Sequence, residues 1–284
     1  MRDEVGYILH PSSLIPCFMR ELIYGRNAVH EVLRANRREV YQILVAEGAQ
    51  ERGVLAEVLA LAAQRNLPIQ RVPRSRLDYV SDAHQGVAVE TGPYPYVNPE
   101  DILDLAAERG EPPLVLVLDV IQNPQNLGTL FRTAEAMGVH GAILPQRRGV
   151  EVTLAVVSAS SGASEHMRIA RVVNLVRTME ELKELGVWIA GLEHKDERAI
   201  DFWSADLRGA LALVVGNEAE GMRRLVRQTC DYLLRIPMRG HIESLNAAIA
   251  GSIVLYEVLR QRRANSRLPK SWRLRKSDER EDSP

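Results

Sequence analysis

The sequence is poor in cysteine and in long apolar runs, and each shortage excludes a class of protein. Its 284 residues contain only Cys17 and Cys230, too few for a disulfide framework or a zinc cluster. We therefore expect reduced thiols in a cytoplasmic protein. No apolar run approaches the roughly 18 to 20 residues that a membrane span needs, and the first 20 residues do not resemble a secretory signal. We expect no membrane partner.

Motifs for several common chemistries are also missing. The sequence has no H-E-x-x-H motif, no cysteine-rich metal spacing, no G-x-S-x-G elbow and no clear pair of catalytic carboxylates. It also lacks the Gly-Lys-Ser/Thr end of a triphosphate loop and the G-x-G-x-x-G of a dinucleotide fold. We therefore expect no metal site, and an ATP- or NAD-binding protein is disfavoured.

Lysine is scarce, and the basic residues are almost all arginine. Only four of the 36 basic residues are lysine, and the rest are arginine. The net charge of the chain is -1. Arginine clusters occur at Arg34/Arg37/Arg38, Arg71/Arg74/Arg76, Arg147/Arg148 and Arg223/Arg224/Arg227. A GC-rich genome or a solvated face explains any one cluster. The planar guanidinium of arginine pairs with phosphate and stacks on bases. Several arginine clusters together are therefore compatible with a nucleic acid as the partner.

The chain divides into two α/β units. Residues 20–92 predict the smaller one, and the proline-containing residues 93–113 predict a linker with a short helix at its centre. The expected elements of the small unit are helices at 22–36 and 51–66 and strands at 40–47, 68–72 and 86–90. Residues 1–19 form an N-terminal extension, and residues 264–284 predict a basic, disordered tail.

The second unit, residues 114–263, alternates apolar strands with helices. Strands are expected at 114–120, 141–145, 168–172, 187–192, 211–216 and 232–238, and a last helix at 244–263. Buried apolar strands that alternate with helices favour a parallel, doubly wound sheet. Because ligands of such sheets bind beyond the carboxyl ends of the strands, the loops that follow the strands are the candidate sites.

Two of these loops place polar residues between a strand and a helix. In NPQNLGTLFR, Asn126 is expected to cap the helix, and Arg132 lies in an early exposed turn. In VVGNEAEGM, Glu218 could accept hydrogen bonds or pair with an arginine. Each loop alone is also explained by ordinary helix capping or by the preference of helix N-termini for negative charge.

A third loop, IPMRGHIESLN, leads into an apolar helix that is rich in small residues. Ser244 and Asn246 stand at the start of this helix, and its small side chains would permit close packing of other segments. An N-cap role would account for Ser244 without accounting for Asn246.

Together, and in this order, the motifs NLGTLFR, GNEAEGM and IPM…ESLN resemble the signatures of the SpoU/TrmH class of RNA ribose 2′-O-methyltransferases, within the SPOUT superfamily. YGRNAVHEVL and HQGVAV resemble the subgroup that methylates a guanosine of 23S rRNA, and the resemblance covers roughly residues 23–263. Two departures concern substrate detail. Asn123 stands where aspartate is more usual, and VVSASSGA lacks a lysine that often precedes this segment.

The resemblance implies a fold, a cofactor and partners. The fold would be a C-terminal SPOUT domain with a parallel sheet and a deep trefoil knot, preceded by a small α/β RNA-recognition domain of ribosomal-protein-like type. The cofactor would be S-adenosyl-L-methionine, the substrate RNA, and the assembly a homodimer with both subunits contributing near the site. Carried over by position, the cofactor-binding residues would be Gly216, Ile236, Met238 and Leu245.

The resemblance also implies a catalytic set. A ribose 2′-hydroxyl must attack the sulfonium methyl in line, so positioning and charge stabilisation account for most of the catalysis. Because a guanidinium rarely gives up its proton, we expect Arg132 to stabilise the developing alkoxide rather than act as a base. Asn126 would orient Arg132 or the ribose, and Glu218 would hold Arg132 or a backbone amide. Ser244 and Asn246 would fix the last turn and the nucleotide.

Alternatives remain within and outside the enzyme class. A tRNA 2′-O-ribose methyltransferase of the same superfamily shares the motifs, although the separate N-terminal unit favours rRNA. A non-catalytic RNA-binding relative would be expected to have lost Arg132 or Asn246, and both are present. We therefore expect methylation of a guanosine ribose in 23S rRNA, either free or in a particle that is assembling into the large ribosomal subunit.

Overall fold

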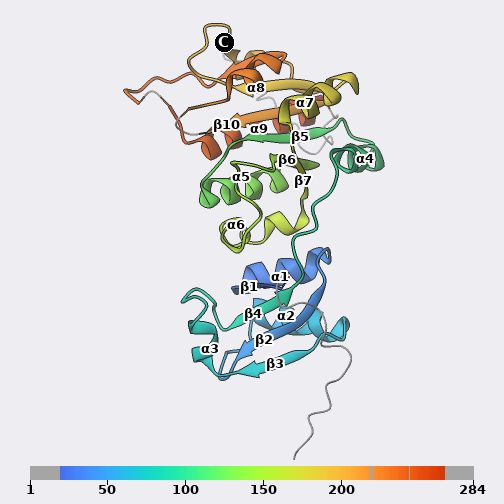
Figure 1. The fold of residues 1–284 in the computed structure, drawn as a ribbon, viewed down its shortest axis with the longest axis vertical. Coiled ribbons are helices and arrows are strands. Elements are labelled where there is room, and N and C mark those ends of the chain that lie inside the picture. The colour runs from blue at the N-terminus through green and yellow to red at the C-terminus, as the bar shows by residue number, and fades with distance from the viewer. Residues whose placement is uncertain (1–19, 218–219, 243, 266–284) are drawn as a thin grey trace, which may run out of the picture. The chain divides into compact units, whose positions relative to one another are not determined.

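The structure, a computed structural model, describes residues 20–217, 220–242 and 244–265 (Figure 1). The chain forms two compact units and passes from the first to the second between Pro95 and Tyr96. The expectations for residues 1–19 and for the basic tail beyond residue 265 lie outside the described residues. In the part of the chain that is described, no helix has the length and apolar character to cross a membrane.

The first unit is a four-stranded sheet with helices. Its elements are β1 (Glu21–Tyr24), α1 (Arg26–Ala35), β2 (Val40–Ala46), α2 (Val54–Gln64), β3 (Ile69–Val72), α3 (Arg74–Asp78) and β4 (Val87–Thr91). The strand order is β1-β4-β2-β3, with β4 antiparallel to both of its neighbours and β3 parallel to β2. Leu44, Val72 and Leu77 are buried in a core between the sheet and α3.

The expectation of a helix from residue 22 is wrong at its start. Residues 21–24 form β1, which pairs with β4 from Glu21–Thr91 to Tyr24–Ala88. Gly25 then turns the chain with a φ of 93°, a conformation that side chains other than glycine rarely adopt. Helix α1 therefore begins at Arg26. The local pattern was helical, but pairing with a strand some 65 residues away decided the structure.

The second unit is a seven-stranded sheet covered by helices. Its elements are α4 (Pro99–Arg109), β5 (Leu114–Asp119), α5 (Pro124–Ala136), β6 (Gly141–Pro145), α6 (Leu154–Ala159), η3 (Ala163–His166), β7 (Arg168–Val172), α7 (Leu175–Glu184), β8 (Trp188–Leu192), β9 (Ile200–Asp201), η4 (Phe202–Ser204), β10 (Leu211–Gly216), α8 (Arg224–Thr229), β11 (Tyr232–Arg235) and α9 (Ala247–Asn265). The strand order is β7-β6-β5-β10-β8-β11-β9, and all neighbouring pairs are parallel. The parallel α/β fold is thus confirmed.

Alternate residues of the central strand face different helices. Val214 of β10 lies in a buried cluster with residues of α7 and α8. Its neighbour Val215 lies against α9, where a Cβ added to Gly251 would be 3.2 Å from Val215. Because successive side chains of a strand point to opposite faces, helices cover both faces of the sheet.

The stretch expected as a linker contains α4, which belongs to the core of the second unit. Asn98 and Asp101 form a capping box at the start of this helix, with Pro99 in its first turn. Ile102 is fully buried in the same cluster as Val214.

The sheet order reverses beside β10. This strand lies between β5 and β8, and its last residue, Gly216, stands opposite Asp119 of β5. On the other side Leu192 of β8 stands opposite Leu234 of β11. The carboxyl ends of four strands therefore lie along one edge, where open α/β sheets bind ligands.

Candidate active site

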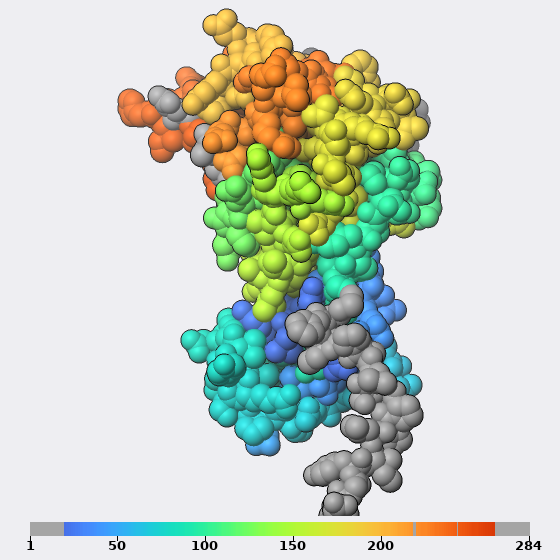
Figure 2. All heavy atoms as spheres, in the orientation of Figure 1, coloured from blue at the N-terminus to red at the C-terminus, as the bar shows by residue number. Residues whose placement is uncertain are grey.

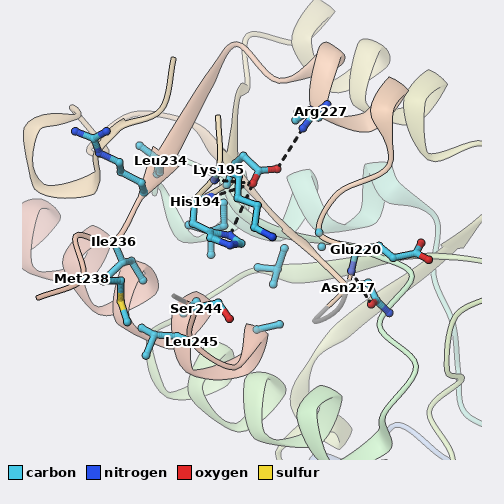
Figure 3. A pocket seen from close by; sticks show the side chains of 18 residues that line it. His194, Lys195, Asn217, Glu220, Arg227, Leu234, Ile236, Met238, Ser244 and Leu245 are labelled. Carbon is cyan, nitrogen blue, oxygen red and sulfur yellow. Dashed lines mark hydrogen bonds and ion pairs between the residues drawn. The ribbon is translucent and has the colours of Figure 1, made fainter. Parts of the chain in front are cut away.

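A cleft of about 190 Å³ lies at this edge of the sheet (Figure 3). Its walls come from the ends of β8, β10 and β11 and from the start of α9. Five of the residues expected to be functional line it: Gly216, Ser244, Ile236, Met238 and Leu245. In Figure 3 the last three lie on the side opposite Asn217 and Glu220. The structure therefore brings together the expected cofactor residues.

The first and third motifs are joined by a hydrogen bond between two asparagines. Asn246 Nδ2 donates to Asn126 Oδ1 over 3.0 Å. Asn246 Oδ1 accepts from the backbone N–H groups of Ala248 and Ile249, at 2.9 and 3.3 Å. Asn246 is therefore the residue that caps α9, and the helix begins at Ala247, not at Ser244 as expected.

Asn126 is not the cap of α5, contrary to expectation. Asn123 takes that position, because its Oδ1 accepts from the N–H of Gln125 at 2.9 Å and Pro124 occupies the first helical turn. Asn126 lies within that turn, and its side chain is directed to Asn246.

Arg132 is exposed and lies outside the described lining of the cleft. Its Nη1 donates to Ser161 Oγ at 3.3 Å, in the turn after α6. The close approach of α5 and α6 depends on Gly128, since an added Cβ there would stand 2.5 Å from Ala159 Cβ. The structure thus separates Arg132 from the cofactor residues of the same chain.

The second motif forms a tight loop over the ends of two strands. Asn217 and Gly221 exchange two backbone hydrogen bonds, of 3.0 and 2.9 Å. A Cβ on Gly216 would stand 2.4 Å from the backbone of Gly221, so only glycine fits there. Asn217 Nδ2 also donates to the carbonyl of Val120 at 3.1 Å. Glu218 lies outside the described residues.

Val120 has a φ of 62°, which is strained for a β-branched residue. It links β5 to the first motif, and its carbonyl accepts the hydrogen bond from Asn217 of the second motif. This strained residue therefore ties the first two motifs together.

Sequence reasoning missed an ion pair beneath this loop between a buried carboxylate and a guanidinium that is 45% exposed. Asp119, fully buried at the end of β5, accepts from the backbone N–H of Arg223 at 2.7 Å and from Arg223 Nε at 2.6 Å. Arg223 directly precedes α8, so the pair joins the first motif's strand to the segment after the second motif. The available signal was one aspartate at the end of the apolar run LVLVLDV.

Sequence reasoning also missed Glu193, which lines the cleft after β8. Its carboxylate accepts from the backbone N–H groups of His194 and Lys195 at 3.0 and 3.1 Å. Arg227 Nη1 lies 3.7 Å from its Oε2 (Figure 3). Glu193 thereby supplies a nearly buried negative charge to the cleft wall.

These residues fit S-adenosylmethionine, which carries a positive sulfonium, an apolar purine face and no phosphate. Apolar side chains such as Leu245 and Met238 share the lining of the cleft with the acidic residues Glu193 and Glu220. Backbone groups at the ends of β10 and β11 are available for the polar edges of the cofactor.

Burial raises the pKa of the nearby Cys230 thiol to about 12, so this thiol is protonated at neutral pH.

Comparisons with known proteins identify the family of the chain. Residues 113–256 match the profile of the SpoU rRNA Methylase family, and residues 22–97 match a profile described as RNA 2′-O ribose methyltransferase substrate binding. YacO of Bacillus subtilis (strain 168), provisionally assigned to the TrmH family of tRNA/rRNA methyltransferases, is 42% identical over 243 residues. That alignment covers 85% of this chain and 96% of the relative.

Solved structures share the fold across both units. The SpoU methyltransferase AviRb from Streptomyces viridochromogenes, crystallised with AdoMet (S-adenosylmethionine), has a TM-score of 0.73 at 22% identity, over 87% of this chain and 92% of that one. A crystal structure of an RNA 2′-O ribose methyltransferase has a TM-score of 0.69 at 27% identity, over 86% and 89% of the two chains.

The fold and the cleft define an S-adenosylmethionine-dependent methyltransferase. The chain belongs to the SpoU rRNA methylase family, within the TrmH/SpoU class of RNA methyltransferases. Its cofactor is S-adenosylmethionine, and its first unit is the substrate-binding domain of that family. The resemblance inferred from the three motifs is confirmed at this level.

Proposed function

We propose that the protein methylates the 2′-hydroxyl of a ribose in RNA, and that this ribose belongs to a guanosine of 23S rRNA in the cytoplasm. The hydrogen bond between Asn126 and Asn246 carries the proposal, because it joins the first motif to the rim of the cofactor cleft. The match of residues 22–97 to a 2′-O ribose substrate-binding profile supports the position of methylation.

Bound S-adenosylmethionine supplies an electrophilic methyl group on a positive sulfonium. Gly216, Ile236, Met238 and Leu245 hold the cofactor, mainly through backbone groups, and Ser244 shapes the turn beside it. The chain's remaining task is to aim the ribose hydroxyl at the methyl group, which lowers the barrier by fixing the approach.

The first motif stabilises the charge that develops during the reaction. Arg132 stays protonated and stabilises the negative charge that develops on the attacking oxygen, while the proton leaves to water or phosphate. Asn126 and Asn246 position the nucleotide together, and Glu218 holds Arg132 or a backbone amide. Asn126 contacts Asn246, whereas Arg132 contacts Ser161. Because the two side chains contact different segments of the chain, their arrangement fits a site that a second chain completes.

The proposal includes a deep trefoil knot in the second unit and a ribosomal-protein-like first unit. In support of the knot, the chain leaves β11 at the far side of β8 and returns as α9, which packs on β10 and α5 (Figure 1). Gly251 allows this return, because a Cβ there would stand 2.9 Å from Leu130 of α5.

We also propose that the enzyme is a homodimer, with α9 in the interface. Three large apolar side chains at helical spacing are exposed on this helix: Ile249 (46%), Ile253 (36%) and Tyr256 (61%). In such a dimer Arg132 of one chain can reach the cleft of the other, which explains why it does not line its own.

Ile253→Glu is expected to convert the dimer to a monomer and to abolish methyl transfer, since a charge would be buried at the centre of the stripe. Light scattering coupled to size exclusion measures the mass. The matched control is Leu185→Glu, at a position 64% exposed just after α7, which should stay dimeric. A monomeric wild-type protein, or a dimeric Ile253→Glu variant, contradicts this interface.

The target RNA can be tested with tritiated S-adenosylmethionine and separate pools of unmodified 23S rRNA, 16S rRNA and tRNA. We expect label in 23S rRNA alone, released on nuclease digestion as 2′-O-methylguanosine and mapped by mass spectrometry. Label in tRNA would instead establish the tRNA methyltransferase alternative. Absence of transfer to all three pools and to partly assembled large-subunit particles, with cofactor binding intact, would support a non-catalytic RNA-binding relative.

A further inference from the structure

The first unit carries a polar face formed by α3, the turn that follows it and the start of α1. An open hollow in this face is lined by Arg26, Arg74 and Gln85. In the space-filling view the teal segment around α3 projects from the side of the first unit (Figure 2). We call this surface the α3 face.

An exposed aromatic ring directly follows α3, the helix that begins with Arg74 of the hollow. Tyr79, directly after α3, is 94% exposed, and Val80 next to it is 40% exposed. Leu77 is the residue of α3 that is buried in the core, while the Tyr79 ring is left in solvent. Among the described residues the Tyr79 ring has no aromatic or cation–π partner. Both of its faces are available for stacking.

The arginines of the hollow keep their positive charge available. Arg26 donates to the backbone carbonyls of Gln85, Arg52 and Gln50, at 3.2, 3.5 and 3.4 Å, rather than to a carboxylate. Arg74 lies 3.8 Å from Asp78, at the limit of an ion pair, and is 65% exposed. The exposed guanidinium of Arg74 therefore suits a phosphate oxygen, and Arg26, whose three guanidinium nitrogens already donate to carbonyls, adds positive charge to the hollow.

A buried histidine holds the two sides of the face together. His84 is fully buried, and its Nε2 donates to Asp78 Oδ1 at 2.8 Å while its Nδ1 accepts from the N–H of Gly86 at 2.8 Å. This pairing fixes the end of α3 against the turn at Gln85. Gln85 Oε1 accepts in turn from the N–H of Arg26 at 3.0 Å. The stacking ring and the guanidinium groups are thus carried on one rigid frame.

We propose that the α3 face binds an unpaired nucleotide of the substrate RNA, with its base stacked on Tyr79 and its phosphates held by Arg26 and Arg74. The inference rests on the proposed function, which makes RNA the substrate. Proteins bind looped or single-stranded RNA by stacking unpaired bases on aromatic rings, while neighbouring basic side chains contact the phosphates. A protein partner would require a wider apolar patch than one ring and a valine.

Tyr79→Ala in the full-length protein is expected to weaken binding of transcribed 23S rRNA about tenfold, within the range for loss of one stacked base. Filter binding measures the dissociation constant. Tyr79→Phe should bind like the wild type, because the ring is kept. The KM for S-adenosylmethionine should not change in either variant, and thermal unfolding should show that both fold.

Arg74→Gln tests the phosphate contact. It should weaken binding at low salt and reduce the slope of log K against log salt concentration by about one. Arg34→Gln is the matched control, because Arg34 is 66% exposed on α1 and lies outside the lining of the hollow. That variant should keep the wild-type slope.

Ultraviolet cross-linking with mass spectrometry should attach Tyr79 to a nucleotide that is unpaired in the RNA. Wild-type affinity in Tyr79→Ala, or a cross-link confined to duplex RNA, overturns the proposal. These readouts measure binding and need no turnover. If the protein transferred no methyl group to RNA, the proposed function would fail while the α3 face was still tested.

Discussion

Arg132→Ala will lower the rate of methyl transfer to RNA by about a hundredfold or more and leave the affinity for S-adenosylmethionine nearly unchanged. The loss corresponds to removal of one group that stabilises an oxyanion in the transition state. Cofactor affinity should survive because the proposed contacts to the cofactor come from Gly216, Ile236, Met238 and Leu245, whereas the role proposed for Arg132 is at the attacking oxygen. Single-turnover transfer of a labelled methyl group and calorimetric titration with the cofactor measure the two quantities.

A matched control separates this effect from a general loss of surface charge. Arg177→Ala removes an arginine that is also exposed, on α7, and should keep wild-type activity. Arg132→Lys should recover part of the rate, because it keeps the charge and loses the planar fork. Full turnover by Arg132→Ala would eliminate Arg132 as a catalytic residue.

Arg223→Met will destabilise the protein by about 2 kcal/mol, because the buried carboxylate of Asp119 loses the guanidinium of Arg223 and keeps the hydrogen bond from the backbone N–H of residue 223. The same change should weaken cofactor binding, since Arg223 follows the loop that lines the cleft at Gly216 and Gly221. Urea unfolding gives the free energy of unfolding, and calorimetry gives the affinity.

The neighbouring arginine provides the control for that variant. Arg224 contacts Gln228 on the surface, and Arg224→Met should change the unfolding free energy by less than about 0.5 kcal/mol. Asp119→Asn combined with Arg223→Met should be more stable than Arg223→Met alone, because a neutral amide costs less to bury than a carboxylate. Equal stability of Arg223→Met and the wild type would show that the pair contributes nothing.

Residues close in sequence predicted much of the fold. Apolar runs such as LVLVLDV and LALVVG became β5 and β10, neighbours in a parallel sheet, as their alternation with helices indicated. Strands of this kind can be recognised from local composition, because a strand that is buried on both faces is apolar along its whole length. The prediction failed at residues 22–24, where local helical character gave way to pairing with β4.

Five of the predicted site residues line one cleft, whereas the geometry of the first motif was predicted only in part. Three motifs identified the family and its cofactor, and both are confirmed. Capping was assigned to Asn126, yet Asn123 caps α5 and Asn246 caps α9. The cap of α5 was readable locally, because Asn123 is followed by a proline at the first helical position. The hydrogen bond between Asn126 and Asn246 was not, since these residues are 120 positions apart in the sequence.

The sequence by itself determined the parallel α/β order, the three loops at strand ends and the family to which the chain belongs. Only the tertiary structure decided which loops meet. It joined Asn126 to Asn246, placed Glu193 in the cofactor cleft and buried Asp119 beneath Arg223. Hydrophobic periodicity and composition indicate the structure of residues that are close in sequence. The pairings that build a site arise where strands distant in the chain end at one edge of the sheet.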